Sequence, residues 1–118
     1  MSDDPTDATP HDAEIELAMV TLTFDAMPND TANRSLLAVL AKYIVMARME
    51  DGCRNIDLCS SVTTSRRHLI IQKWDSSERQ RAHFDSPLMV DMATSCSGLL
   101  ASAPEIDLWD GTSAHDLA

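Results

Sequence analysis

The sequence predicts an α+β protein with the element order strand, helix, strand, strand, helix, strand. In this ferredoxin-like arrangement, one four-stranded antiparallel sheet carries helices on one face. Two observations support the expectation. Four short segments place apolar residues on alternate positions, and two longer segments repeat apolar residues at helical spacing.

The strand expected at residues 66–74 is the centre of this prediction. Leu69 and Ile71 point to one face of the strand, while Ile70 and Trp74 point to the other. We therefore expect apolar neighbours on both faces of this strand.

A single amphipathic helix is expected to follow this strand. Asp75 is its predicted N-cap, and Glu78 stands where the acid of a capping box reaches back. The apolar stripe of this helix consists of Phe84, Leu88, Met92, Cys96, Leu99 and Leu100.

The first strand is expected at residues 14–25, with a polar face at its start and both faces buried further along. A break at residues 26–30 separates it from a helix capped by Asp30 or Thr31. Gly52 suits a left-handed residue after this helix. The apolar stripe of the helix consists of Leu36, Leu37, Leu40, Tyr43, Ile44 and Ala47.

The second strand is expected at residues 53–62, and a turn at 63–65 joins it to the third strand as a hairpin. A fourth strand is expected at residues 105–110. In that strand Leu108 and Trp109 point to opposite faces.

Length and charge limit the possible functions. The 118 residues predict one domain at 14–111, with a disordered acidic tail at 1–13 and a second tail at 112–118. The net charge of -10 argues against nucleic-acid binding, which needs a basic face. No signal peptide and no apolar run of the ~20 residues needed to cross a membrane are visible, so we expect a cytoplasmic protein without a membrane partner.

The cysteines predict neither a disulfide nor a zinc site. Cys53 and Cys59 fall on the same expected strand, roughly 20 Å apart, and Cys96 leaves an odd number. There is no C-x-x-C motif and no His pair at ligand spacing.

The sheet is expected to need a partner. Two helices cover only one of its faces, yet the first and third strands and Trp109 offer apolar groups to both. A second copy of the same sheet would cover the open face, which predicts a homodimer closed sheet to sheet into a barrel.

Two motifs resemble a known family. Residues 48–53 read Arg-Met-Glu-Asp-Gly-Cys and are similar to an Arg-x-Glu-Pro-Gly-Cys junction. Residues 72–76, then Ala82 and His83, then Ser86 and Pro87, are similar to a Glu-x-Trp-x-Ser, Ala-His, Ser-Pro run. Together they resemble the antibiotic biosynthesis monooxygenase domain of the dimeric α+β barrel superfamily, over nearly the whole expected domain.

The resemblance implies a cofactor-independent monooxygenase. In such enzymes a phenolic or quinol-type aromatic molecule is deprotonated, and its anion reacts with O₂ without flavin or metal. His83 is the candidate base, because imidazole titrates near neutral pH. The candidate substrate-binding residues are Trp74, Asn55, Arg48 and Tyr43.

Each candidate also has a plainer interpretation. His83 is compatible with a partly exposed helix residue, and Trp74 and Tyr43 with core packing. Asn55 and Arg48 are compatible with solvated positions.

The chain also departs from the family pattern. Leu88 stands where quinol-oxidising relatives often have a second His, and Ile56 stands where a Tyr is common. The haem-degrading pattern has a Trp at the position of His83, a His near Ala93 and an Asn on the first strand. All three are missing, so haem degradation is not expected.

Three hypotheses stay open. The chain is a monooxygenase acting on a phenolic aromatic, an isomerase using His83 on the same scaffold, or a dimeric ligand-binding or interaction module that has lost catalysis. A deep pocket beside His83 would favour either enzyme. A volume filled by Leu88 and Ile56 would favour the third hypothesis.

Overall fold

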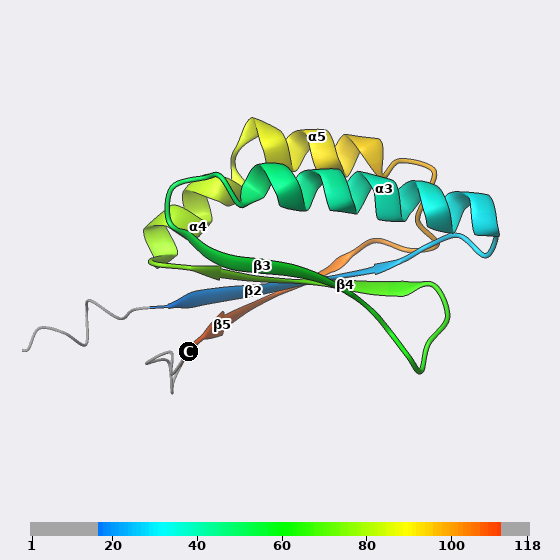
Figure 1. Ribbon diagram of the computed structural model, residues 1–118, viewed down its shortest axis with the longest axis horizontal. Helices are drawn as coiled ribbons and strands as arrows, with labels where there is room; N and C mark the ends of the chain where they lie inside the picture. Colours follow the sequence, from blue (N-terminus) through cyan, green and yellow to red (C-terminus); the bar gives the residue numbers. More distant parts are fainter. Residues whose placement is uncertain (1–16, 112–118) are drawn as a thin grey trace, which may run out of the picture.

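The computed structural model describes residues 17–111. Four strands form one antiparallel sheet in the order β3-β4-β2-β5, and the three helices lie together on one face of it (Figure 1). The predicted ferredoxin-like α+β fold is confirmed. The elements are β2 (Ala18–Asp25), α3 (Asp30–Ala47), β3 (Cys53–Ser60), β4 (Arg67–Trp74), α4 (Ser77–Phe84), α5 (Pro87–Ser95) and β5 (Glu105–Asp110). The expected tails at 1–13 and 112–118, and the expected start of the first strand at 14–16, lie outside the described residues.

The buried residues of β2 and β4 lie on the helix-facing side of the sheet. In β4 buried residues alternate with residues that are half-buried or exposed, and Leu69 and Ile71 are half-buried on the open face. The helices of a single chain bury one face only, so the expected burial of the second face of the first and third strands depends on a partner that covers it. The core between helices and sheet consists of Val20, Leu22, Phe24, Ala26, Leu36, Leu40, Tyr43, Ile44, Ala47, Ile56, Ile70, Trp74, Met92 and Cys96.

Helix α3 is capped by Asn29 and not by Asp30 or Thr31. Asn29 has an extended backbone, and its Oδ1 accepts a hydrogen bond from the Ala32 amide at 2.8 Å. Asp30 is then the first helical residue, where its carboxylate interacts favourably with the helix dipole.

The expected second helix is two helices. Ser76, not Asp75, caps α4 by accepting from the Arg79 amide at 3.1 Å. Pro87 cannot continue α4, because it lacks the amide hydrogen and its ring clashes with the preceding turn. It stands instead in the first turn of α5, which Ser86 caps.

The turn from α3 to β3 packs against the start of α4. Gly52 has the predicted left-handed backbone, with φ of 86°, and its carbonyl accepts from the Asp75 amide at 2.8 Å. A Cβ at this position would lie 2.7 Å from the Cβ of Arg79. Glycine therefore permits a close approach that brings the α3–β3 turn, including Glu50, against α4.

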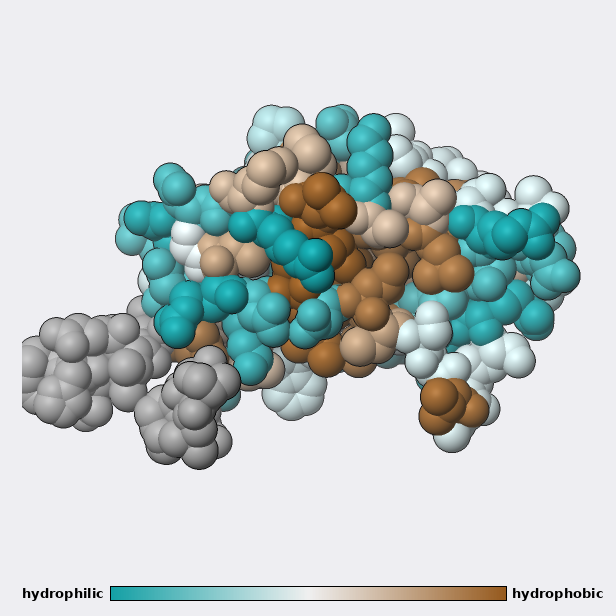
Figure 2. Space-filling model, viewed as in Figure 1, coloured by the Kyte–Doolittle hydropathy of each residue, from teal (hydrophilic) through white to brown (hydrophobic). Residues whose placement is uncertain are grey.

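The β3–β4 hairpin forms as predicted, although β3 ends at Ser60 and not at residue 62. Val62 in the hairpin loop is 98% exposed, and Figure 2 shows an isolated hydrophobic patch at the tip of this hairpin. Strand β5 has the predicted bounds, and all six of its residues are exposed. Among the described residues, no helix has the length and apolar character that a membrane span requires.

Candidate active site

His83 lies at the centre of a buried hydrogen-bonded chain. Its Nε2 is 2.5 Å from the hydroxyl of Tyr43 on α3, and its Nδ1 is 2.6 Å from a carboxylate oxygen of Glu50 in the α3–β3 turn. Beyond Tyr43 the chain continues through Gln72 to Trp74, both on β4. Two helices (α3 and α4), one strand (β4) and the α3–β3 turn thus bring these five side chains together.

Trp74, at the end of the hydrogen-bonded chain, determines which group donates and which accepts at each step. An indole N–H can only donate, so Trp74 Nε1 donates to Oε1 of Gln72 at 3.0 Å. The amide nitrogen of Gln72 then faces the other way and donates to the Tyr43 hydroxyl oxygen at 2.6 Å. The proton of the Tyr43 hydroxyl is left to point at His83.

This direction also assigns the hydrogen bonds of His83. Because Tyr43 donates to Nε2, that nitrogen presents its lone pair, and the ring proton resides on Nδ1. The Nδ1–H donates to the Glu50 carboxylate. In this arrangement Nε2 of His83 faces the Tyr43 hydroxyl, and the Glu50 carboxylate lies beside Nδ1.

The hydrogen-bonded chain around His83 is shielded from water except at Glu50. His83 is 3% exposed and Tyr43 2% exposed, whereas the Glu50 side chain is 32% exposed. Burial raises the pKa of the Tyr43 phenol well above its usual value of 10.0, and the hydrogen bond from Gln72 offsets part of this rise. Tyr43 is therefore a phenol and not a phenolate at neutral pH.

Trp74 stacks against the ring of His83. The two rings stack with centroids 4.6 Å apart and an interplanar angle of 30°. Trp74 is fully buried in the core, so the structure places it behind His83 and not on the wall of an open pocket. Tyr43 is also buried in the core with its hydroxyl hydrogen-bonded, which agrees with its interpretation as a core-packing residue.

Two of the predicted site residues lie elsewhere. Arg48 is exposed, and its guanidinium donates to the Ile56 carbonyl at 3.0 and 3.3 Å. Asn55 is exposed opposite Lys73 and donates to Asp57 at 3.1 Å. Neither Arg48 nor Asn55 belongs to the hydrogen-bonded network around His83.

The sequence interpretation missed Gln72 and Glu50. A signal for Gln72 was present, because it falls between Ile70 and Trp74 on the buried face of β4. Glu50 stands within the Arg-Met-Glu-Asp-Gly-Cys motif, but its partner is 33 residues away along the chain. Only the folded turn shows that pairing.

The helix layer contains a groove between α3 and α5. Its volume is about 500 Å³, and its wall includes Tyr43, Leu88 and Met92, with Lys42 and Asp91 as charged members. Figure 2 shows hydrophobic side chains gathered across the middle of this view of the molecule and hydrophilic ones at both ends. Tyr43 thus links the buried chain to a groove whose size suits a small molecule.

The two residues that depart from the family pattern fill space. Ile56 is fully buried on the helix-facing side of β3. Leu88 is partly buried against the core and forms part of the groove wall. His83 is thus surrounded by packed side chains and does not open onto a deep pocket in this structure.

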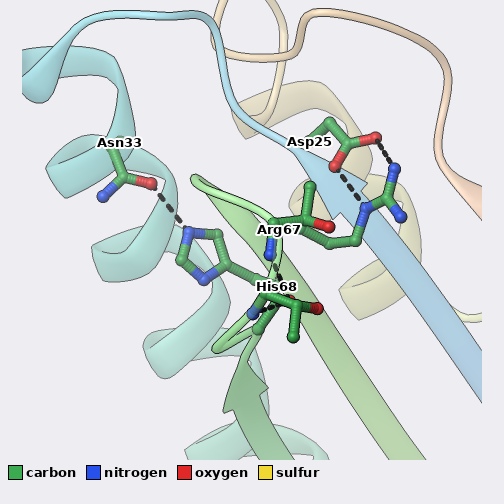
Figure 3. Close-up of polar contacts among 7 residues, drawn as sticks. Asp25, Asn33, Arg67 and His68 are labelled. Carbon is green, nitrogen blue, oxygen red and sulfur yellow. Dashed lines mark hydrogen bonds and ion pairs between the residues drawn. The ribbon is translucent and has the colours of Figure 1, made fainter.

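A second buried histidine lies at the other end of the sheet (Figure 3). His68 on β4 contacts Asn33 on α3 at 2.7 Å through Nε2 and Ser60 on β3 at 2.8 Å through Nδ1. The neighbouring Arg67 forms two hydrogen bonds with the Asp25 carboxylate, at 2.8 and 3.1 Å. This cluster ties α3 and the β3–β4 hairpin together and lies apart from His83.

Metal-binding groups do not converge in the part of the chain that the structure describes. Among residues 17–111, no three His, Cys, Asp or Glu side chains lie close enough to hold one metal ion. The three cysteines in that part are free thiols.

Residues 19–95 match the family model described as antibiotic biosynthesis monooxygenase. The chain belongs to this family. The match includes every member of the hydrogen-bonded chain around His83. Among curated proteins, none matches the chain significantly.

Solved structures share the fold of this family member. Rv0793 from Mycobacterium tuberculosis is 25% identical, with a TM-score of 0.71 over 79% of this chain and 92% of that one. A candidate antibiotic biosynthesis monooxygenase from Deinococcus radiodurans is 18% identical, with a TM-score of 0.72 over 78% and 89%. A conserved protein from Methanosarcina mazei Go1 is 13% identical, with a TM-score of 0.74 over 84% and 96%.

Proposed function

We propose that this protein is a cofactor-independent monooxygenase that oxidises a phenolic or quinol-type aromatic molecule with O₂. The observation that supports the proposal is the directed chain of hydrogen bonds from Trp74 to Glu50. It places Nε2 of His83 against a hydroxyl and Nδ1 against a carboxylate. These are the requirements of a general base.

The base acts through Tyr43. A substrate hydroxyl in the groove between α3 and α5 transfers its proton to the Tyr43 oxygen, while Tyr43 passes its own proton to Nε2 of His83. Glu50 stabilises the resulting imidazolium through Nδ1–H. The substrate is left as an electron-rich anion.

The oxygen step needs no further reductant. The aromatic anion gives electrons to O₂, and a carbon–oxygen bond forms at the activated ring carbon. Loss of water then leaves a carbonyl at that carbon. For a ring CH₂ the balance is CH₂ plus O₂ to C=O plus H₂O, with the electrons taken from the substrate.

The proposal requires the substrate to reach Tyr43. Neither Tyr43 nor His83 is open to solvent in this structure, so entry must part the side chains of the groove wall. Leu88 and Met92 belong to that wall, and methionine side chains repack readily.

Oxygen uptake with a panel of reduced naphthoquinols and anthrones tests this function. We expect uptake above the spontaneous rate in metal-chelated, flavin-free buffer. His83→Ala and Tyr43→Phe should each lower the rate about 10²-fold or more, the usual contribution of general-base catalysis. Asn55→Ala is the matched control and should keep the wild-type rate, because Asn55 lies outside the buried chain.

The outcome also separates the alternatives. Turnover of a carbonyl substrate that persists without oxygen and depends on His83 would indicate an isomerase on the same scaffold. Folded protein that shows neither activity would indicate the ligand-binding or interaction module. The closed packing of Ile56 and Leu88 is the observation that favours this module, which is therefore the second candidate function.

The homodimer is part of the proposal. The open face of the sheet carries half-buried Met19, Leu69 and Ile71, and β5 adds Trp109, which is more than half exposed. A second copy packed face to face would bury these side chains. This arrangement leaves the groove between α3 and α5 outside the interface.

A further inference from the structure

A second groove lies between α4 and β5. Its volume is about 630 Å³, within the range of small-molecule sites. Phe84 of α4 and Ile106 and Leu108 of β5 supply apolar wall. The helices leave β5 uncovered, and Leu108 is 67% exposed. The groove is therefore an apolar surface that the fold of one chain does not fill.

Gln80 is the unusual member of this groove. It is 9% exposed, and its side-chain amide has no hydrogen-bond partner among residues 17–111. Gln72, by contrast, uses both ends of its amide in the chain around His83. A buried amide without a partner is costly, so such groups in native proteins are normally satisfied by something bound beside them.

We propose that this groove binds a planar aromatic molecule whose edge carries a hydrogen-bond donor next to a carbonyl acceptor. A primary amide presents one N–H donor and one carbonyl acceptor side by side. An aromatic lactam pairs with both at once. The ring system then lies against the apolar wall from β5 and Phe84.

This site is separate from the proposed active site. His83 bonds to Tyr43 and Glu50 on the α3 side of α4, whereas Gln80 faces the groove shared with β5. Binding at Gln80 requires neither O₂ nor proton transfer. The inference therefore stands whether or not the chain is a monooxygenase.

Nuclear magnetic resonance tests the site directly. The chain has two glutamines, Gln72 and Gln80, so a ¹H–¹⁵N spectrum contains two glutamine side-chain amide pairs, which the variant Gln80→Met assigns. The probe is 2-quinolone, a planar lactam, and the matched control probe is N-methyl-2-quinolone, which lacks the donor. We expect 2-quinolone to shift the Gln80 pair and to leave the Gln72 pair in place.

Affinity measurements complete the test. Gln80→Met keeps the side-chain length but removes the amide, and should weaken 2-quinolone binding about tenfold or more. It should weaken N-methyl-2-quinolone less, because that probe can pair with the amide only through its carbonyl. If that variant does not fold, Gln80→Glu replaces it, because a carboxylate facing the lactam carbonyl should weaken binding as well. A shift at Gln72 instead of Gln80, no shift at either, or equal affinity in the variants would overturn the proposal.

Discussion

Two buried histidines in one small domain take different roles because their neighbours differ. His83 faces a phenol and a carboxylate, so a proton that it accepts is stabilised by Glu50. His68 faces an amide carbonyl and a serine hydroxyl, and the burial that surrounds it lowers its pKa below the usual 6.5, with Asp25 offsetting part of the shift. The first arrangement favours proton transfer, and the second favours a fixed neutral ring.

The lowered pKa of His68 predicts a pH dependence of stability. The unfolded chain binds a proton at higher pH than the folded chain, so this contribution is fully present above pH 6.5 and is lost as the pH falls below it. We expect the free energy of unfolding, measured with urea, to be lower at pH 5.5 than at pH 7.5. His68→Gln should make this difference smaller.

His83→Gln is the control for this measurement, since it removes the other buried histidine and leaves the cluster around His68 in place. It should retain the loss of stability that His68 causes. An equal loss in wild type and His68→Gln would contradict the prediction.

At the scale of elements, the approach of the α3–β3 turn to α4 decides whether Glu50 reaches His83. Gly52→Ala would place a Cβ 2.7 Å from the Cβ of Arg79 and 2.9 Å from the Asp75 carboxylate, at φ of 86°. Gly98→Ala has a similar φ of 81° but meets nothing within 4 Å. Both variants carry the left-handed backbone cost of about 1–2 kcal/mol, and only Gly52→Ala adds a steric clash.

We therefore expect Gly52→Ala to lower the free energy of unfolding by about 1 kcal/mol more than Gly98→Ala, measured by urea denaturation. Oxygen uptake should also fall in Gly52→Ala alone, because the turn that carries Glu50 is displaced. Equal losses in the two variants would show that the turn relaxes without cost.

The elements also show how far sequence reasoning reaches. Strand β5 and the hairpin follow from alternation and turn residues, which act locally. The break at Pro87 was missed because the apolar stripe runs through it, although a proline after a serine is itself a helix start. The pairing of Glu50 with His83 joins distant parts of the chain, and no local pattern predicts it.

For the whole molecule, the asymmetry between the two faces of the sheet is the dominant feature. The helices lie on one face only (Figure 1), and the other face carries half-buried apolar residues. Ile71 lies near the middle of this open face, paired with Thr21 on β2 and Asp57 on β3. It is half-buried in the single chain, so its substitution should affect an interface more than the fold.

Sedimentation of Ile71→Lys tests the dimer at this position. A lysine there is tolerated in the single chain, because Asp57 lies directly across on β3 and opposite charges pair favourably across strands. In a face-to-face dimer the same charge would be buried against its own copy, which is strongly unfavourable. We expect the wild type to sediment as a dimer and Ile71→Lys as a folded monomer. Val62→Lys, at the exposed hairpin tip, should stay dimeric, and a monomeric wild type would refute the barrel.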